Sequence, residues 1–186
     1  METSRWRCGP SRVRRVFSAT WVSVLFGVVY VVSQSLIAAI LRPIGAADFL
    51  RLQCLGFRAS DYLATFSRWE PSGCLAAYRA HLWPDDLHWI WYAVFLTSLL
   101  ARLLQVNCVP ARADVVLLLP WAAGLCDLIE NCLQHLFLSV PRWGAVVDPL
   151  PLISTVASDL KWLLIAICIG IMVTLTVRAF RQGTRA

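Results

Sequence analysis

The fold class is decided by the stretch VVLLLPWAAGLCDLIENCLQHLFLSV, residues 115–140, which is apolar enough and long enough to cross a bilayer. A membrane-spanning helix needs about 20 predominantly apolar residues. Polar residues nevertheless recur in the stretch, and on a helical wheel that advances about 100° per residue they fall within roughly 140° of arc. We therefore predict a membrane-spanning helix with one polar side that faces other helices. The polar residues are Asp127, Glu130, Asn131, Gln134 and His135.

Three further apolar stretches have a length sufficient for a span, namely residues 16–41, 87–106 and 152–177. The first contains no charged residue, and it is too long for the apolar part of a cleaved signal peptide, which covers only about 7–15 residues. We predict an all-α fold, a polytopic membrane protein built as a four-transmembrane-helix bundle. Residues 1–186 are expected to form a single membrane domain.

The composition agrees with a membrane protein. Of the 186 residues, 59% are hydrophobic and 15% are charged, and the mean hydropathy is +0.65. Soluble domains have about 45–50% apolar and about 25% charged residues. The net charge of +6 does not indicate nucleic-acid binding, because the basic residues are not gathered on a polar domain. The expected partner is the lipid bilayer. The sequence does not indicate whether the protein is a monomer or an oligomer.

Motifs for cofactors are not visible in the sequence. It has no zinc, haem, P-loop or dinucleotide-binding pattern, so we expect no cofactor and no metal site. Two of the seven cysteines, Cys54 and Cys74, share one loop. In an oxidising compartment they would form a disulfide or remain as thiols with about equal expectation.

The arginines indicate the orientation. Ten of the basic residues lie in the N-terminal tail, the second connection and the C-terminal tail. Because short cytoplasmic segments carry the excess of Arg and Lys, both termini are predicted to be cytoplasmic and the loop 42–86 extracytoplasmic. The membrane is the cell membrane in a bacterium, or the endoplasmic reticulum or another endomembrane otherwise.

The loop 42–86 has the pattern of folded, amphipathic helices. One is predicted from Ser60 to Trp69 and a second from Ser72, with apolar residues at helical spacing in both. They would lie on the membrane surface or cover the bundle. Pro84 suits the first position of the second span, with Asp85 and Asp86 in its first turn. Pro120 is expected to kink the third span.

Polar residues of all four spans are predicted to converge at one level, in the outer half of the bundle. A charge at the centre of a membrane helix costs about 2.5–3.5 kcal/mol, so these residues must pair, share protons or meet water. Lys161 is the only lysine, and Asp127 or Glu130 matches its depth. We therefore predict an ion pair beside a polar pocket that opens to the outer side.

Three functions are compatible with this pocket. The leading hypothesis is the binding of a small lipid-like or amphipathic ligand, in which Lys161 supplies a counter-charge or meets an anionic group. The second is a membrane-embedded acid/base enzyme, isomerase-like, that acts on a lipid; its candidate catalytic residues are Glu130, Asp127 and His135. The third is a non-catalytic scaffold or assembly factor, in which the polar stripe only holds helices together. The ligand-binding candidates are Asp127, Glu130, Asn131, Gln134, Lys161, His81 and Asp85.

Three short patterns carry a resemblance: Gly73-x4-Tyr78-x2-His81-Leu82-x2-Asp85, Asp127-x2-Glu130-Asn131 and Lys161-Trp162. Over roughly residues 45–175 the chain resembles an uncharacterised class of small four-span membrane proteins of bacterial genomes, which implies the architecture and no activity. More distantly it resembles the EXPERA group of sterol isomerases and related receptors. That likeness implies an intramembrane pocket for a cationic or sterol-like ligand. Lys161 departs from it, because a buried lysine argues against a site built for cations.

Overall fold

Four helices of the computed structural model are long and apolar enough to cross a membrane, as predicted, so the chain is a multi-pass membrane protein. The structure describes residues 11–139 and 144–183, and these form helices without any strand. The spans are α2 (Thr20–Leu41), α5 (Cys74–Val106), α6 (Leu119–Ser139) with the preceding 3₁₀ helix η1 (Ala111–Leu118), and α7 (Leu150–Gly183). Three shorter helices are α1 (Arg12–Phe17), α3 (Ala46–Leu55) and α4 (Ala59–Trp69).

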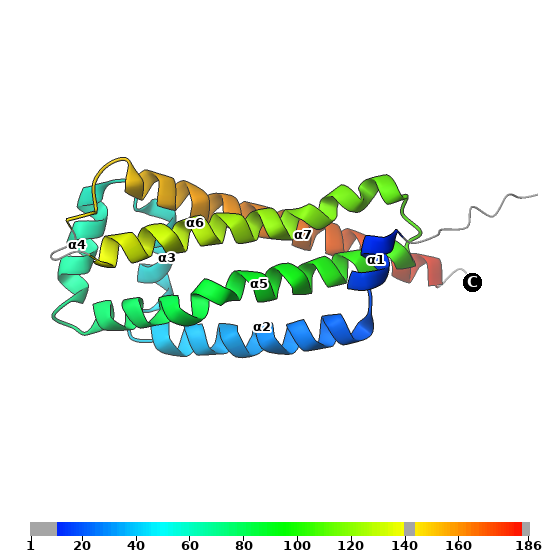
Figure 1. The fold of residues 1–186 in the computed structure, drawn as a ribbon, viewed down its shortest axis with the longest axis horizontal. Helices are drawn as coiled ribbons and strands as arrows, with labels where there is room; N and C mark the ends of the chain where they lie inside the picture. The colour runs from blue at the N-terminus through cyan, green and yellow to red at the C-terminus, as the bar shows by residue number, and fades with distance from the viewer. Residues whose placement is uncertain (1–10, 140–143, 184–186) are drawn as a thin grey trace, which may run out of the picture.

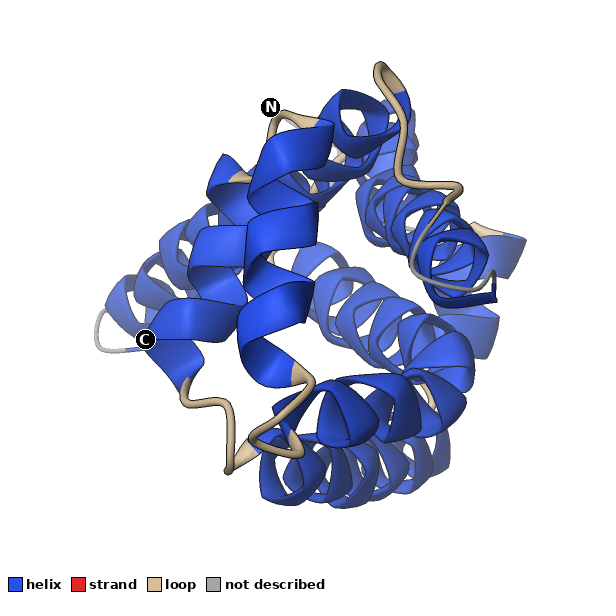
Figure 2. Cartoon of the chain, turned by 90° about the vertical axis from the view of Figure 1, so that its left-hand side faces the viewer, coloured by secondary structure: helices blue, strands red, loops and turns tan. Residues whose placement is uncertain are grey.

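The long helices lie side by side in one bundle (Figure 1). Helix α2 packs on α5, α5 on α6 and α6 on α7. Helix α1 and the C-terminal end of α7 lie at one end, which we call the terminal end (Figure 1). Helices α3 and α4 run across the opposite end, the loop end, which faces the viewer in Figure 2. The chain therefore crosses an even number of times, in agreement with the predicted four spans.

Helix α4 covers the loop end because one of its faces is apolar. Tyr62 and Phe66 are 0% exposed and Trp69 is 3% exposed, and the spacing of these three residues is that of one helical face. The ring of Tyr62 meets Phe137 of α6 edge to face, with 5.1 Å between the ring centroids. The apolar face of the predicted loop helix is thus buried against the bundle. Helix α3, its neighbour, was not predicted.

The prediction for Pro84 is wrong. Helix α5 begins at Cys74, after Gly73 in a left-handed conformation (φ +76°), and continues through Pro84 to Val106. A proline inside a helix removes one backbone hydrogen bond. Here the turns before Pro84 bury Tyr78 and Leu82 in the core of the loop end, and this packing holds the helix together across the proline. The second loop helix and the second span are therefore one continuous helix.

Pro120, expected to kink the third span, lies where this span changes from η1 to α6. This helix begins at Leu119, so Pro120 lies in its first turn, where a backbone N–H has no acceptor within the helix. The chain changes there from the 3₁₀ geometry of η1 to α-helix. Proline thus marks the start of the regular α-helix within the third span.

The terminal end is held by a buried arginine. Arg14 of α1 is only 4% exposed. Its guanidinium donates to Asp114 Oδ1 at 2.5 Å and to the carbonyls of Val109 and Pro110 at 2.5 and 2.8 Å. Because these three acceptors belong to the connection between α5 and η1 and to η1 itself, Arg14 ties α1 to the second connection. Arg14 was counted among the positive charges that indicate orientation, and it also has this structural role.

The predicted orientation can be tested with one cysteine at each end. Ser67 is exposed on α4 at the loop end, and Cys108 is exposed after α5 at the terminal end. In a chain whose other cysteines are replaced, we expect a membrane-impermeant maleimide added to intact cells to label Ser67→Cys. Cys108 should react only after permeabilisation. The reverse pattern, measured by a gel shift, would place the loop end in the cytoplasm.

Candidate functional site

A buried ion cluster joins α6 and α7. Lys161 Nζ donates to Asp127 Oδ1 at 2.7 Å and to Glu130 Oε2 at 2.6 Å. The three residues are 6%, 2% and 1% exposed. Asp127 and Glu130 are three residues apart on α6 and so lie on one helical face, which turns both carboxylates toward α7. Lys161 was expected to pair with Asp127 or Glu130, and it pairs with both.

Helix α3 completes the cluster. Gln53, 5% exposed, donates from Nε2 to Glu130 Oε1 at 2.6 Å, so each oxygen of Glu130 has a partner. The end of α3 is fixed where the hydroxyl of Thr155 donates to the carbonyl of Gly56 at 2.8 Å. A Cβ atom at Gly56 would lie 2.5 Å from the carbonyl oxygen of Leu52, so this position requires glycine.

A second polar network lies nearer the loop end, around Gln134. The hydroxyl of Tyr78 donates to Gln134 Oε1 at 2.8 Å. Gln134 Nε2 donates to the hydroxyl of Tyr62 at 2.9 Å and to Ser154 Oγ at 3.0 Å. Burial raises the pKa of Tyr62, so its hydroxyl stays neutral at physiological pH. The network joins α4, α5, α6 and α7 through neutral groups.

A cleft of about 320 Å³ reaches the ion cluster from the side of the bundle. It lies between α2 and α7, which are not closely packed against each other over their described residues, with α5 as its back wall. Trp162 and Ile169 on its rim are 46% and 48% exposed, so it opens toward the surroundings of the bundle. Its polar lining residues are Gln34, Gln53, Asp85, His88, Asp127 and Lys161, and its aromatic and aliphatic ones include Tyr30, Tyr92, Phe95, Leu96, Leu99, Ile165, Ile169 and Met172.

The cleft changes from polar to apolar along its length. On α5, Asp85 comes first from the loop end, followed by His88 and then by Phe95 and Leu99. On α7, Lys161 precedes Ile165, Ile169 and Met172 in the same direction. Along α5 and α7 the polar lining therefore lies toward the loop end and the apolar lining toward the terminal end, while Ile37 and Phe49 add apolar lining at the loop end.

The predicted site residues fall into three groups. Asp85, Asp127 and Lys161 line the cleft, and Glu130 lies directly behind them in the ion cluster. Asn131 is buried on the same face of α6. Gln134 belongs to the separate tyrosine network, and His81 is 2% exposed and contacts the carbonyl of Tyr78 through Nδ1. Gln134 and His81 are not among the lining residues of the cleft.

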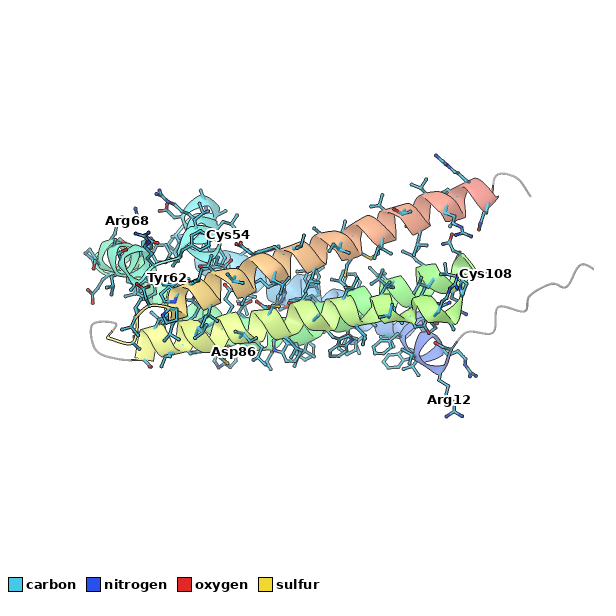
Figure 3. All side chains as sticks on the ribbon, turned by 90° about the horizontal axis from the view of Figure 1, so that it is seen from above. Arg12, Cys54, Tyr62, Arg68, Asp86 and Cys108 are labelled. Carbon is cyan, nitrogen blue, oxygen red and sulfur yellow. The ribbon has the colours of Figure 1, made fainter. Side chains whose placement is uncertain are left out.

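His135 lies apart from the cluster, contrary to the inward position that was predicted for it. Its ring is 52% exposed, and its Nε2 is 2.9 Å from Asp86 Oδ2 of α5. Asp86 lies on the flank of the bundle, away from Tyr62 and Cys54 at the loop end (Figure 3). An acid on the neighbouring helix thus holds this histidine at the edge of the polar stripe.

The two loop cysteines do not form a disulfide. Cys54 and Cys74 are both thiols. The thiol of Cys74 donates to the carbonyl of Pro43 at 3.5 Å. Burial raises the pKa of the Cys54 thiol, and the negative charge of Asp159 raises it further. The two thiols therefore have different neighbours, Pro43 for Cys74 and Asp159 for Cys54.

Comparisons of the chain with protein-family models, with curated proteins and with solved structures find no match. The functional argument therefore depends on the residues themselves. Sequence reasoning missed Gln53, Tyr30 and Tyr92. For Gln53 a signal was available. Phe49 and Leu52 have the spacing of an amphipathic helix, but α3 is only ten residues long, so the pattern is short.

Proposed function

We propose that this membrane protein binds a small lipid-like or amphipathic molecule in the cleft between α2 and α7. The apolar part of the molecule would lie against Phe95, Leu99 and Ile165, and its polar group would lie at the end formed by Asp85, Asp127 and Lys161. One observation carries the proposal: a cleft that opens on the side of the bundle leads to a buried cluster of ionisable groups.

Two physical arguments support the proposal. Sites for small ligands occupy about 300–1,000 Å³ and are mostly apolar with a few placed polar groups, and this cleft has both properties. Ionisable groups within the membrane are costly, and in membrane proteins they commonly mark the path or site of a ligand. A side opening also gives a molecule dissolved in the bilayer direct access, without passage through water.

The arrangement favours binding over the acid/base hypothesis. Glu130, the leading catalytic candidate, has both oxygens occupied by Lys161 and Gln53, and it does not line the cleft. His135, the third candidate, is exposed beside Asp86. A proton carrier must reach the proton that it moves, and neither Glu130 nor His135 faces the cleft. Asp127, the second candidate, does line the cleft, but Lys161 already donates to it at 2.7 Å.

Photolabelling tests the proposal. The probes are dodecyl chains that carry a diazirine and end in an amine, a hydroxyl or a carboxylate group, each added to the purified protein in mild detergent. We expect at least one probe to label peptides of α5 and α7 that line the cleft. Ile165→Trp fills the cleft and should reduce this labelling by about tenfold or more, the equivalent of about 1.4 kcal/mol.

The matched control is Leu163→Trp. Leu163 lies two residues before Ile165 on α7 and is 56% exposed, and it does not line the cleft. This variant should label as the unchanged protein does. Labelling that is spread over the exposed faces of the spans and is equal in both variants would show that the cleft holds no amphiphile, which the scaffold hypothesis expects.

A further inference from the structure

We propose that the head group held in this cleft is a protonated amine, so that the ligand class is a long-chain or otherwise apolar amine. This inference rests on the proposed function and adds the chemistry of the head group. It starts from the balance of charge at the polar end. The acids there are Asp85, Asp127 and Glu130, whereas Lys161 is the only Lys or Arg among the described residues of the cluster and the cleft lining.

Lys161 is already occupied by the protein. Its ammonium donates to two buried carboxylates at 2.6 and 2.7 Å, and it lies 5.6 Å from the ring centroid of Trp162. Two of its three N–H groups are thus used by carboxylates, and an anionic head group at the third would add a further negative charge to the cluster. Lys161 lines the cleft, but two carboxylates compensate its charge, so its burial does not argue against a cation there, contrary to the expectation from the sequence.

Asp85 is the acid at this end of the cleft that has no ion pair with Lys161. It lines the cleft, and it takes part in neither ion pair of Lys161. A carboxylate inside a membrane protein that has no ion-pair partner of its own is costly unless a cation or a proton compensates it. A protonated amine from the bilayer supplies that cation, and its chain then extends along the apolar part of the cleft.

Gln53 provides an independent sign of a missing hydrogen-bond donor. Its Nε2 donates to Glu130, which leaves its Oε1 directed elsewhere. This Oε1 is buried and has no hydrogen-bond partner within the structure, although Gln53 lines the cleft and is only 5% exposed. Buried amide oxygens are normally paired. An ammonium group has three donors and no acceptor, so it can serve Gln53 and Asp85 together.

Aromatic rings surround the next part of the cleft. Tyr30 stacks on His88 with 5.3 Å between the ring centroids and on Phe95 with 5.7 Å, and Tyr92 lines the same wall. The faces of such rings attract cations that have lost part of their water. The rings stack on one another and form an aromatic wall of the cleft, which is suited to the carbon atoms attached to an amine.

Competition between head groups tests the inference. Dodecylamine, dodecanol and dodecanoate are each added against the labelling of the cleft by the hydroxyl-ended probe. At neutral pH the amine is protonated, because primary alkyl amines titrate near the lysine value of about 10.4. We expect half-displacement by dodecylamine at a concentration at least about tenfold below that of dodecanol, and weaker displacement by dodecanoate.

Asp85→Asn should remove the preference for the amine while the hydroxyl-ended probe still labels the cleft. The matched control is Asp159→Asn, an exposed acid on α7 outside the cleft lining, and it should keep the preference. A thermal unfolding scan checks that both variants fold; a loss of both labelling and folding in Asp85→Asn would make this residue structural and overturn its role in head-group recognition.

The outcomes separate the two proposals. Preference for dodecanoate, or equal displacement by the amine and the alcohol, would overturn the head-group inference and leave cleft binding intact. Labelling that Ile165→Trp does not reduce would overturn the cleft proposal, and the head-group inference with it.

Discussion

Lys161→Met is expected to lower the free energy of unfolding by about 3–5 kcal/mol, the range measured when one partner of a buried ion pair is removed. Methionine keeps most of the length of the side chain and removes the ammonium. Asp127 and Glu130, 2% and 1% exposed, would then lie together without their cation. The loss is measured by reversible unfolding in mixed micelles of a mild detergent and dodecyl sulfate.

Neutral partners supply the control. In Lys161→Met combined with Asp127→Asn and Glu130→Gln, no charge is left in the ion cluster, and at least half of the lost stability should return. Arg178→Met changes a cation on the exposed surface of α7 and should leave stability unchanged. If Lys161→Met alone is as stable as the original chain, the acids are neutral in the folded protein and the cluster is not an ion pair.

The spans could be predicted from the sequence because few structures other than a helix satisfy the backbone hydrogen bonds within the hydrocarbon of a bilayer. Each of the four apolar stretches corresponds to a helix, and α2 and α7 differ from prediction only at their ends. The error in the spans concerns Pro84. Local rules place a helix start at Pro84, but the packing of Tyr78 and Leu82 with α4 continues α5 by several turns. Tertiary contacts outweighed one missing hydrogen bond.

The ion cluster could be predicted because charged residues are rare in the spans. The chain has one lysine and few acids within its spans, so depth alone left Asp127 and Glu130 as partners. Gln53 could not be found in the same way, because it reaches Glu130 from a short helix in the loop, 77 residues away in sequence. The position of such a helix across α7 is set by the whole loop end and not by a local pattern.

His135 shows the limit of the helical wheel. It lies on the margin of the arc that contains Asp127, Glu130 and Gln134, and a wheel cannot say where the buried face ends. The neighbouring helix decides this, since Asp86 of α5 offers an acceptor on the exposed side at 2.9 Å. The side chain of His135 therefore pairs with Asp86 and is 52% exposed.

Gln134→Leu is the second substitution with a large expected effect, a loss of about 3 kcal/mol of unfolding free energy. The residue is 1% exposed and is hydrogen-bonded to Tyr62, Tyr78 and Ser154. Leucine removes the common partner of three buried hydroxyl groups, and each unsatisfied group costs about 1–3 kcal/mol before the structure relaxes. Unfolding in mixed micelles, followed by the signal of the nearby tryptophan residues, measures the loss.

Removal of the hydroxyl groups should reverse the effect. Tyr62→Phe, Tyr78→Phe and Ser154→Ala combined with Gln134→Leu replace donors and acceptors together, which is close to neutral when the shape is kept. Cys132→Leu, at an exposed position of the same helix, should change nothing. Since Gln134 does not line the cleft, the folded fraction of Gln134→Leu should keep its preference for dodecylamine. A variant that is fully stable but loses this preference would place Gln134 in ligand recognition instead of in the attachment of α4 to the bundle.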